Sequence, residues 1–381
     1  MNDTRRVISL TPLGFAPVVS VRDELYVPVN KGHFDLEPPE RQRAFSDKLA
    51  QGWQEDYQTY RRLWNELPRT QIVRDYPLLV DLELASRCNL TCPMCPTVTA
   101  EFIEKRVKPF KKGQLDYNLA LRVIDEIADH VYALRLSWVG EPTLHPKLVD
   151  ILAYAKKKGI REVSFLTNGT KLNLAYFKKL ADAGADWITI SIDGMGETYN
   201  QIRKPLKFDE TLQKIRDIKE YKDTHGLTKP VIKIQGVWPA VREAPELFYN
   251  TFAPYVDFIA YNPLIDYLHK DSDILYEENF VCPQHYQRLV ISSNGKAAMC
   301  SNDDNVDEVV GDAHVQTVHE IWHGERLQEI RRIHASGDFK TIESCRRCYY
   351  PRATAVDESA TVNGRLIQIE NYVNRPQTVG K

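Results

Sequence analysis

The sequence predicts an α/β protein that consists of a partial (β/α)6 barrel followed by a small cysteine-rich domain. Three observations support this fold class. Short apolar segments alternate with amphipathic segments between residues 77 and 265, polar motifs follow the apolar segments, and four of the seven cysteines lie in the last third of the chain. Successive βα units form parallel strands covered by helices. A closed eight-stranded barrel would need two more units, so we expect an open barrel.

The alternation places the expected strands at residues 78–84, 132–139, 162–166, 186–192, 231–237 and 256–261. The expected helices lie at residues 117–131, 146–158, 172–183, 209–224 and 244–252. Gly159 and Gly184 follow two of these helices, as glycines commonly do at helix ends. Loops after the carboxyl ends of parallel strands meet at one mouth, so we expect the motifs in those loops to lie together.

We expect four regions along the chain: an N-terminal helical extension at 1–76, the barrel at 77–265, the cysteine-rich domain at 266–350 and a tail at 351–381. Aromatic and apolar residues at spacings of three and four predict one helix over 40–66, with Pro39 before it and Pro68 after it. We interpret this helix as packing on the barrel. A substrate-binding role for its aromatic residues is the alternative.

The composition is that of an ordinary globular protein, with 43% hydrophobic and 27% charged residues among 381. A net charge of −2 provides no basic field for nucleic acid or an anionic membrane, so we expect neither as a partner. No apolar run approaches the length of a transmembrane helix. Metal-binding thiolates must stay reduced, which favours a cytoplasmic location.

Three cysteines, Cys88, Cys92 and Cys95, lie in the run Cys-Asn-Leu-Thr-Cys-Pro-Met-Cys directly after the first expected strand. A 4Fe–4S cluster normally takes four cysteine ligands, so three leave one iron open to a small molecule. The alternatives are a structural zinc site and three unrelated buried cysteines. Zinc sites usually pair two such elements, and the sequence has no second half nearby.

This cysteine spacing resembles that of the radical S-adenosylmethionine (SAM) superfamily, and the resemblance spans about residues 78–350. It implies a partial, TIM-like barrel and a first 4Fe–4S cluster whose open iron binds the amino and carboxylate groups of SAM. It also implies a flavodoxin- or ferredoxin-type reductant as partner.

Gly140, Glu141 and Pro142 end the second expected strand and resemble the Gly-Gly-Glu-Pro motif of this superfamily, with Val139 in place of the first glycine. The resemblance implies that this run binds SAM, because glycine lets backbone carbonyls approach the ammonium group closely. An ordinary strand-to-helix turn is the alternative.

Polar residues also follow the third and fourth expected strands. Asn168 lies in a Thr-Asn-Gly run, and Ser191 and Asp193 lie on one side of an extended segment. The resemblance implies that these residues contact SAM and that Arg203 pairs with its carboxylate. The alternatives are plain Asn-Gly and Asp-Gly turns and a surface arginine.

The remaining cysteines are Cys282, Cys300, Cys345 and Cys348. An Asn-Gly pair at 294–295 predicts a hairpin that leads into Cys300, and a helix is expected at about 316–335. Four cysteines can close one site around zinc or a second 4Fe–4S cluster, and the spacing alone leaves both open. The segment resembles the SPASM domain in its shorter Twitch form, which implies an auxiliary 4Fe–4S cluster.

The two sites use all seven cysteines, so none remains to return a hydrogen atom to a substrate radical, although a tyrosine could do so. This favours oxidation of a small polyol, amino sugar or nucleotide sugar, with the auxiliary cluster as electron acceptor. The chain thus resembles the aminocyclitol-antibiotic dehydrogenases. Those enzymes have an acidic residue two places after the matching cysteine, where this chain has Asn302. The candidate catalytic bases are Asp303 and Asp304. An epimerase or dehydratase, a peptide maturase and a non-catalytic metal-binding protein remain open.

Overall fold

The computed structural model describes residues 25–29, 31, 34–263, 274–374 and 379. Its main sheet has ten strands in the order β1-β7-β6-β5-β4-β3-β2-β8-β9-β10. Neighbouring strands from β2 to β7 are parallel. Their bounds are Leu79–Leu82, Ala133–Arg135, Glu162–Thr167, Trp187–Ser191, Val231–Val237 and Phe258–Asn262. Because β2 and β7 do not pair with each other, the barrel is open, as predicted.

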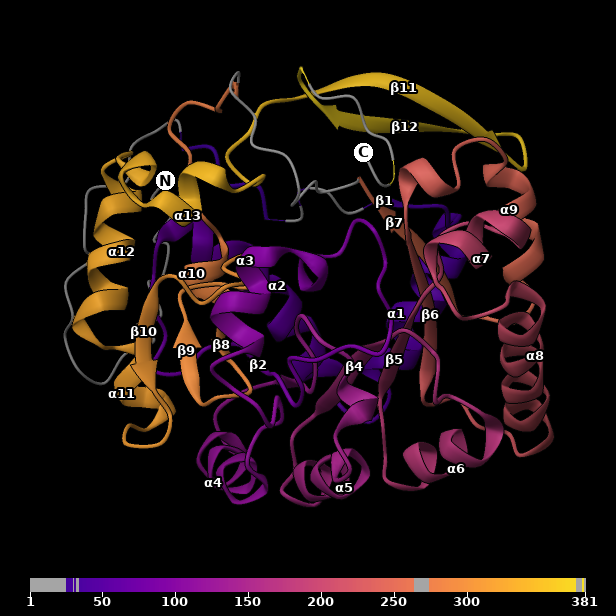
Figure 1. The fold of residues 1–381 in the computed structure, drawn as a ribbon, viewed down its shortest axis with the longest axis horizontal. Helices are drawn as coiled ribbons and strands as arrows, with labels where there is room; N and C mark the ends of the chain where they lie inside the picture. The colour runs from indigo at the N-terminus through magenta and orange to yellow at the C-terminus, as the bar shows by residue number, and fades with distance from the viewer. Residues whose placement is uncertain (1–24, 30, 32–33, 264–273, 375–378, 380–381) are drawn as a thin grey trace, which may run out of the picture.

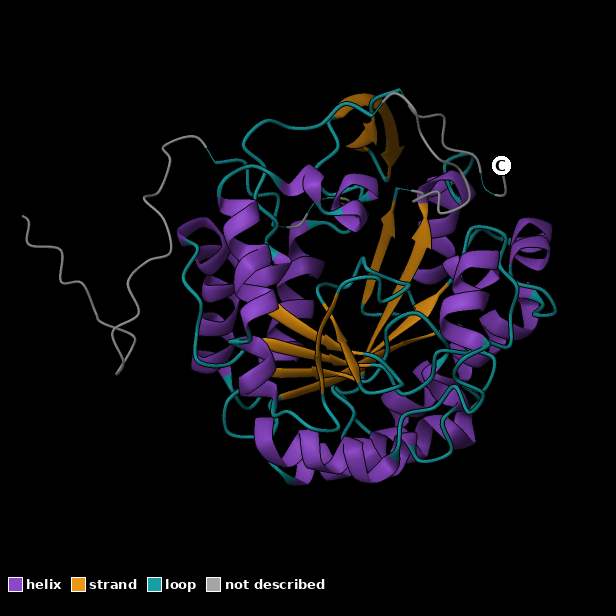
Figure 2. Ribbon diagram, turned by 60° about the vertical axis from the view of Figure 1, so that its left-hand side comes forward, coloured by secondary structure: helices purple, strands orange, loops and turns teal. Residues whose placement is uncertain are grey.

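Helices cover the outer face of these strands (Figures 1 and 2). Alternate strand residues face them, such as Val163 and Phe165 of β4, which are fully buried in the apolar core. The intervening residues face inward and many are polar, including Glu162 and Lys233. The helices are α4 (Tyr117–Ile127), α5 (Leu148–Lys157), α6 (Leu174–Asp182), α7 (Gly196–Ile202), α8 (Phe208–Thr224) and α9 (Pro245–Phe252).

The N-terminal region contains two helices, α1 (Pro39–Ala50) and α2 (Gln54–Thr70), so the prediction of one helix over 40–66 is wrong. Helix α2 also continues through Pro68, which we had expected to lie beyond its end. Proline cannot donate to the carbonyl four residues before it, which is that of Trp64. The side chain of Gln287 donates to this carbonyl instead, at 2.8 Å. This replacement bond allows the helix to continue.

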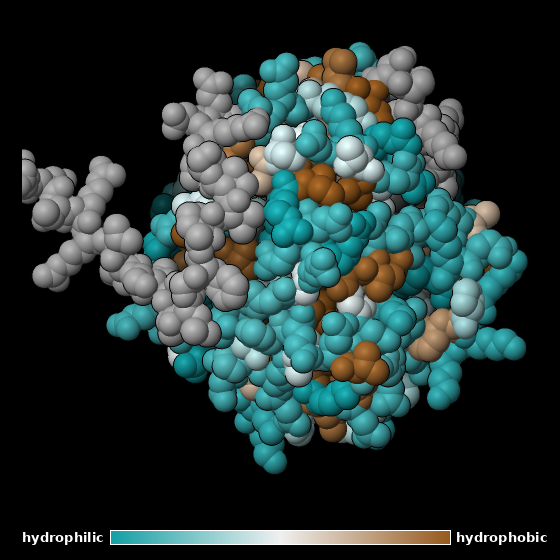
Figure 3. Space-filling view, turned by 90° about the vertical axis from the view of Figure 1, so that its left-hand side faces the viewer, coloured by the Kyte–Doolittle hydropathy of each residue, from teal (hydrophilic) through white to brown (hydrophobic). Residues whose placement is uncertain are grey.

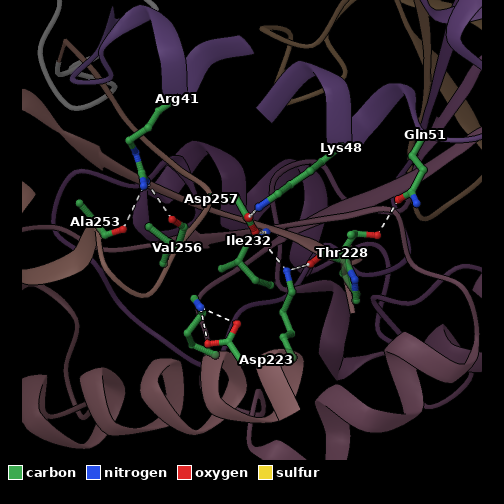
Figure 4. Close-up of polar contacts among 12 residues, drawn as sticks. Arg41, Lys48, Gln51, Asp223, Thr228, Ile232, Ala253, Val256 and Asp257 are labelled. Carbon is green, nitrogen blue, oxygen red and sulfur yellow. Dashed lines mark hydrogen bonds and ion pairs between the residues drawn. The ribbon is translucent and has the colours of Figure 1, made fainter. Parts of the chain in front are cut away.

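Helix α1 is attached to the barrel by charged side chains (Figure 4). Arg41 donates to the carbonyl oxygens of Ala253 and Val256, at 3.1 and 2.9 Å. The Lys48 ammonium contacts the Asp257 carboxylate at 2.5 Å, and that carboxylate also accepts from the backbone of Ile232. These bonds reach the segment between α9 and β7. They hold α1 at the amino ends of the barrel strands.

The cysteine-rich region extends the barrel sheet. Strand β8 (Arg288–Ile291) pairs in parallel with β2, and β9 (Lys296–Ala298) and β10 (Val309–Asp312) continue it in antiparallel fashion. The predicted hairpin at 294–295 is present. The helix expected at 316–335 is instead two helices, α11 (Val318–Trp322) and α12 (Glu325–Ala335). The short helices α10 (Gln284–Gln287) and α13 (Glu343–Arg347) complete the region. The face over α11 and α12 is mostly hydrophilic (Figure 3).

The expected C-terminal tail contains a hairpin, β11 (Thr354–Val362) and β12 (Arg365–Tyr372), which lies beside α9 (Figure 1). Asn363 and Gly364 form its turn with φ of 48° and 73°, the combination that a type I′ turn requires. The backbone of Asn363 donates to Glu246 of α9 at 2.7 Å. The domain boundaries stay predictions, and the one at 265/266 lies outside the described residues. No helix within the described ranges is long and apolar enough to span a membrane.

Candidate active site

The first cysteine set lies in the loop after β2. Cys92 is buried, and Cys88 and Cys95 are half-buried. Short local bonds shape the loop: the backbone of Cys95 donates to the Cys92 carbonyl at 3.0 Å, and the Cys95 sulfur lies 3.1 Å from the Thr97 hydroxyl. Burial raises the pKa of all three thiols, that of Cys92 to about 11. A bound metal offsets this cost because it replaces the proton.

The turn after β3 packs directly against the cysteine loop. A β-carbon on Gly140 would lie 2.2 Å from the carbonyl oxygen of Ala85 and 2.8 Å from that of Arg87. Only glycine fits this close approach of two backbones. The next residue, Glu141, donates its backbone N–H to the Arg87 carbonyl at 2.9 Å. The run Gly140–Pro142 therefore packs against the backbone that leads into Cys88, and its role in binding SAM stays a prediction.

The Glu141 carboxylate is fully engaged within the chain. It accepts bonds from the Thr143 hydroxyl at 2.5 Å, the Thr167 hydroxyl at 2.7 Å and the Asn168 backbone at 2.7 Å. The carboxylate is buried, and this burial raises its pKa. Its geometry is that of a residue that ties the loop after β3 to the end of β4.

Asn168 reaches from the end of β4 to the cysteine loop. Its amide nitrogen donates to the Asn89 side chain at 2.8 Å and lies 3.5 Å from the Cys88 sulfur. Ser191 is the last residue of β5 and is half-buried. Asp193 follows, and its carboxylate accepts from the Arg203 guanidinium at 2.7 Å. Arg203 therefore has a partner within the chain, in addition to the SAM carboxylate that the resemblance implies.

The second cysteine set converges on one small cavity. Cys282, Cys300, Cys345 and Cys348 all line it, together with His334. Burial raises the pKa of each thiol, that of Cys282 to about 12. The His334 ring lies 3.3 Å from the Cys345 sulfur, and the Asn302 amide donates to the Cys348 sulfur at 3.4 Å. Four sulfur donors around a closed space fit a 4Fe–4S cluster, and three on an open loop fit a cluster with one free iron.

The two candidate bases differ in their surroundings. The Asp303 carboxylate accepts from the backbones of Asp307 and Glu308, at 2.9 and 3.0 Å, so it shapes its own loop. The Asp304 carboxyl has no hydrogen-bond partner among the described residues. Burial, and then the neighbouring Asp303 charge, raise its pKa well above the usual range. Of the two, only the Asp303 carboxylate is held by hydrogen bonds from described residues.

Two residues near Asp304 escaped the sequence analysis. Glu83 and Arg106 are both buried and form an ion pair at 2.5 Å. Arg106 also donates to the Asp304 carbonyl and lies over the Trp138 ring, 5.0 Å from its centroid. It belongs to a π-helical turn, Ile103–Val107, a conformation frequent at functional sites. The only signal in the sequence was a pair of charged residues, Asp81 and Glu83, within the apolar run 78–84.

Comparison with known protein families identifies the class of this molecule. Residues 82–230 match the sequence model of the radical SAM superfamily, and residues 282–349 match that of the SPASM iron-sulfur cluster-binding domain. The chain belongs to the radical SAM superfamily and carries a SPASM domain. It is a radical SAM enzyme whose cofactors are SAM and two 4Fe–4S clusters, as predicted. Enzymes of this class require a substrate and a reductant.

Individual relatives carry different names, so they do not assign one reaction to this chain. The chain is 28% identical to the tungsten-containing aldehyde ferredoxin oxidoreductase cofactor-modifying protein of Pyrococcus furiosus, over 68% of this chain and 72% of that protein. It is 30% identical to Fe-coproporphyrin III synthase of Methanosarcina barkeri, over 47% of this chain and 42% of that protein.

Two solved structures share the fold. One is BtrN in complex with AdoMet and 2-DOIA, with a TM-score of 0.50, 18% identity, and coverage of 71% of this chain and 92% of that one. The other is anSMEcpe with bound AdoMet, with a TM-score of 0.51, 16% identity, and coverage of 73% of this chain and 91% of that one. These likenesses concern the fold alone.

Proposed function

We propose that this radical SAM enzyme oxidises a hydroxyl- or amino-bearing carbon of a small polar substrate, such as a polyol, amino sugar or nucleotide sugar. One observation carries the proposal: Asp304, a half-buried residue whose carboxyl has no hydrogen-bond partner among the described residues, lies four residues after Cys300 and beside the Glu83–Arg106 pair. When bound, the first cluster and SAM supply a 5′-deoxyadenosyl radical that removes a hydrogen atom, and the second cluster takes up one electron.

The first cluster would be held by Cys88, Cys92 and Cys95, and the second by Cys282, Cys300, Cys345 and Cys348. Around SAM, the backbone of Gly140–Pro142 would face the ammonium group, and Asn168 and Ser191 would reach the sugar. The Arg203–Asp193 pair would leave further guanidinium donors for the carboxylate of SAM.

Oxidation of an alcohol to a ketone removes a hydrogen atom, a proton and an electron. The hydrogen atom leaves in 5′-deoxyadenosine, and the proton passes from the substrate hydroxyl to the Asp304 carboxylate. A base is most effective when its pKa lies near the working pH, and the raised pKa of Asp304 moves it in that direction. Arg106 and Glu83 provide donors and acceptors for neighbouring hydroxyl groups.

The proposal includes a flavodoxin- or ferredoxin-type reductant and a cytoplasmic location, because both clusters depend on reduced thiolates. It is tested with anaerobically reconstituted enzyme and candidate sugars deuterated at single carbons. We expect deuterium in 5′-deoxyadenosine and a product lighter by the two hydrogens lost. A product that differs from the substrate only in the exchange of this deuterium for hydrogen indicates epimerisation, and loss of water indicates a dehydratase. Either result contradicts the proposed oxidation.

A second candidate is modification of a cofactor or a protein partner. It is favoured by the match to the Pyrococcus furiosus cofactor-modifying protein, which covers most of both chains. Labelled small sugars would then transfer no deuterium, although SAM cleavage would persist at a basal rate.

A further inference from the structure

A second cavity lies at the opposite end of the barrel from the cysteine loops. It has a volume of about 310 Å³ and is lined on one side by the first residues of β4, β5, β7 and β8. Helices α1 and α2 line the other side, with Phe45, Tyr57 and Trp64 among their contributions. We call it the basal cavity. Its volume lies at the lower end of the range for small-molecule sites, about 300–1,000 Å³.

The walls of the basal cavity are held in place. The Phe45 ring of α1 packs on Phe258 with ring centroids 4.4 Å apart, and on the edge of Trp187 at 5.5 Å. The ion pair of Lys48 with Asp257 holds the same helix to the barrel (Figure 4). The cavity is therefore a formed feature of the fold, with flat aromatic surfaces on its walls.

Lys233 projects into this cavity from β6 and is only 5% exposed. Its ammonium group has no hydrogen bond or ion pair within the part of the chain that the structure describes. It lies over the Trp187 and Phe258 rings, whose centroids are 5.5 and 5.7 Å away. Burial, and then the charge of nearby Arg135, lower its pKa to about 7. A buried cation of this kind is costly without an anionic partner.

Glu162 lines the same cavity from β4 and is 6% exposed. Its carboxylate also lacks a hydrogen bond or ion pair from any described residue, and burial raises its pKa to about 7. The neighbouring cations differ from Lys233, because Arg135 and Arg288 both contact Asp81, at 3.6 and 3.2 Å. Among the described residues, the cavity thus contains one buried cation, Lys233, and one buried anion, Glu162, that form no hydrogen bond or ion pair.

A purely structural cavity would gain stability from apolar side chains or from a direct ion pair at these positions. Buried charges without partners lower stability, and such groups commonly belong to functional sites. The aromatic walls favour a planar ligand, since rings stack on one another. Lys233 beside Arg135 favours an anionic group, and Glu162 favours a hydrogen-bond donor.

We propose that the basal cavity binds a small aromatic carboxylate, with its carboxylate at Lys233 and Arg135 and a donor group at Glu162. This site is separate from the active site, because the strands are parallel and the cysteine loop follows their carboxyl ends. The proposal does not depend on the oxidation proposed above.

The test uses 2-aminobenzoate, a fluorescent aromatic carboxylate with an amino donor, and the full-length enzyme with both clusters. We expect saturable binding of one molecule per chain, unaffected by saturating SAM. Lys233→Met should weaken binding by at least about tenfold, the usual order for losing a charged hydrogen bond. Lys157→Met removes the same charge from an exposed position and should leave binding unchanged. Absence of saturable binding, competition by SAM or equal binding by both variants overturns the proposal.

Glu162→Gln supplies a second test if Lys233→Met fails to fold. Benzoate has the carboxylate but lacks the amino donor. The natural chain should prefer 2-aminobenzoate over benzoate, and Glu162→Gln should reduce this preference while leaving the affinity for benzoate within about twofold. An unchanged preference in Glu162→Gln contradicts the assignment of the donor group to this residue.

Discussion

At the carboxyl ends of the barrel strands, the buried Glu141 carboxylate accepts bonds from Thr143, Thr167 and the backbone of Asn168. At the amino ends, the equally buried Glu162 accepts none from the described residues. The first carboxylate joins two loops beside the cysteines. The second faces a cavity together with Lys233, which forms no ion pair with any described residue. The comparison teaches that burial alone does not assign a role to a charge. Its bonded partners distinguish a positioning residue from a group available to a ligand.

The largest expected effect comes from the carboxyl end. Replacing Cys88, Cys92 and Cys95 with alanine should abolish 5′-deoxyadenosine formation, because no thiolates remain to hold the first cluster. The second set should still bind about four irons per chain. Chromatographic assay of 5′-deoxyadenosine and iron analysis measure the two effects. SAM cleavage by this variant would contradict the assignment of the first set.

The next largest effect distinguishes Asp304 from Asp303 as the catalytic base. Asp304→Asn should lower the rate of oxidised-product formation by about a hundredfold, since the proton acceptor is lost. In the natural chain this rate should rise with pH, because the raised pKa of Asp304 delays formation of the basic carboxylate.

Asp303→Asn is the matched control, because it removes the same charge from the adjacent position. It should loosen the loop at Asp307 and Glu308 and lower the melting temperature, with a smaller effect on the rate. If Asp303→Asn impairs catalysis more than Asp304→Asn, the proposed base is wrong.

A smaller effect is expected from Glu141→Ala, which leaves several buried donors without an acceptor. The free energy of unfolding should fall by about 3 kcal/mol, and SAM cleavage should slow by about tenfold. Urea titration measures the first and a 5′-deoxyadenosine assay the second. Glu104→Ala, at a side chain that is 61% exposed, should change neither. If Glu141→Ala is as stable as the natural chain, the proposed difference in role between Glu141 and Glu162 is wrong.

The smallest effect is expected at the amino ends of the barrel strands, where the substitution should raise the stability of the protein instead of lowering it. Lys233→Met should raise the free energy of unfolding at pH 7 by about 1–2 kcal/mol, because a buried unpaired charge is removed.

The pH dependence gives a further check on this residue. The pKa of Lys233 falls from 10.5 to about 7 on folding, so between these values the unfolded chain binds more protons than the folded one. The stability of the natural chain should therefore rise with pH across this range, and its difference from Lys233→Met should shrink. Urea titrations at several pH values measure this difference. If Lys233→Met folds at pH 7 but is less stable than the natural chain, the Lys233 ammonium group has a bonding partner and the prediction is wrong.

Much of the fold and of the cysteine chemistry follows from local patterns. The six barrel strands were predicted because period-two apolar runs and glycine helix ends are properties of short segments. The first cysteine set was predicted for the same reason, since three ligands within one loop need no knowledge of distant contacts. The resemblance extended this to SAM and a second cluster.

What the sequence left undetermined depends on partners far apart in the chain. Helix α2 passes through Pro68 because Gln287 supplies the bond that Trp64 would otherwise lack. Arg106 is positioned by its ion pair with Glu83 and by its hydrogen bond to the backbone of Asp304. Lys233 and Glu162 are inward residues of ordinary-looking strands, and only the packing of α1 and α2 over the barrel leaves a cavity around them. Spacing along a chain therefore defines strands and ligand loops, whereas the pairing of buried charges depends on which segments folding brings together.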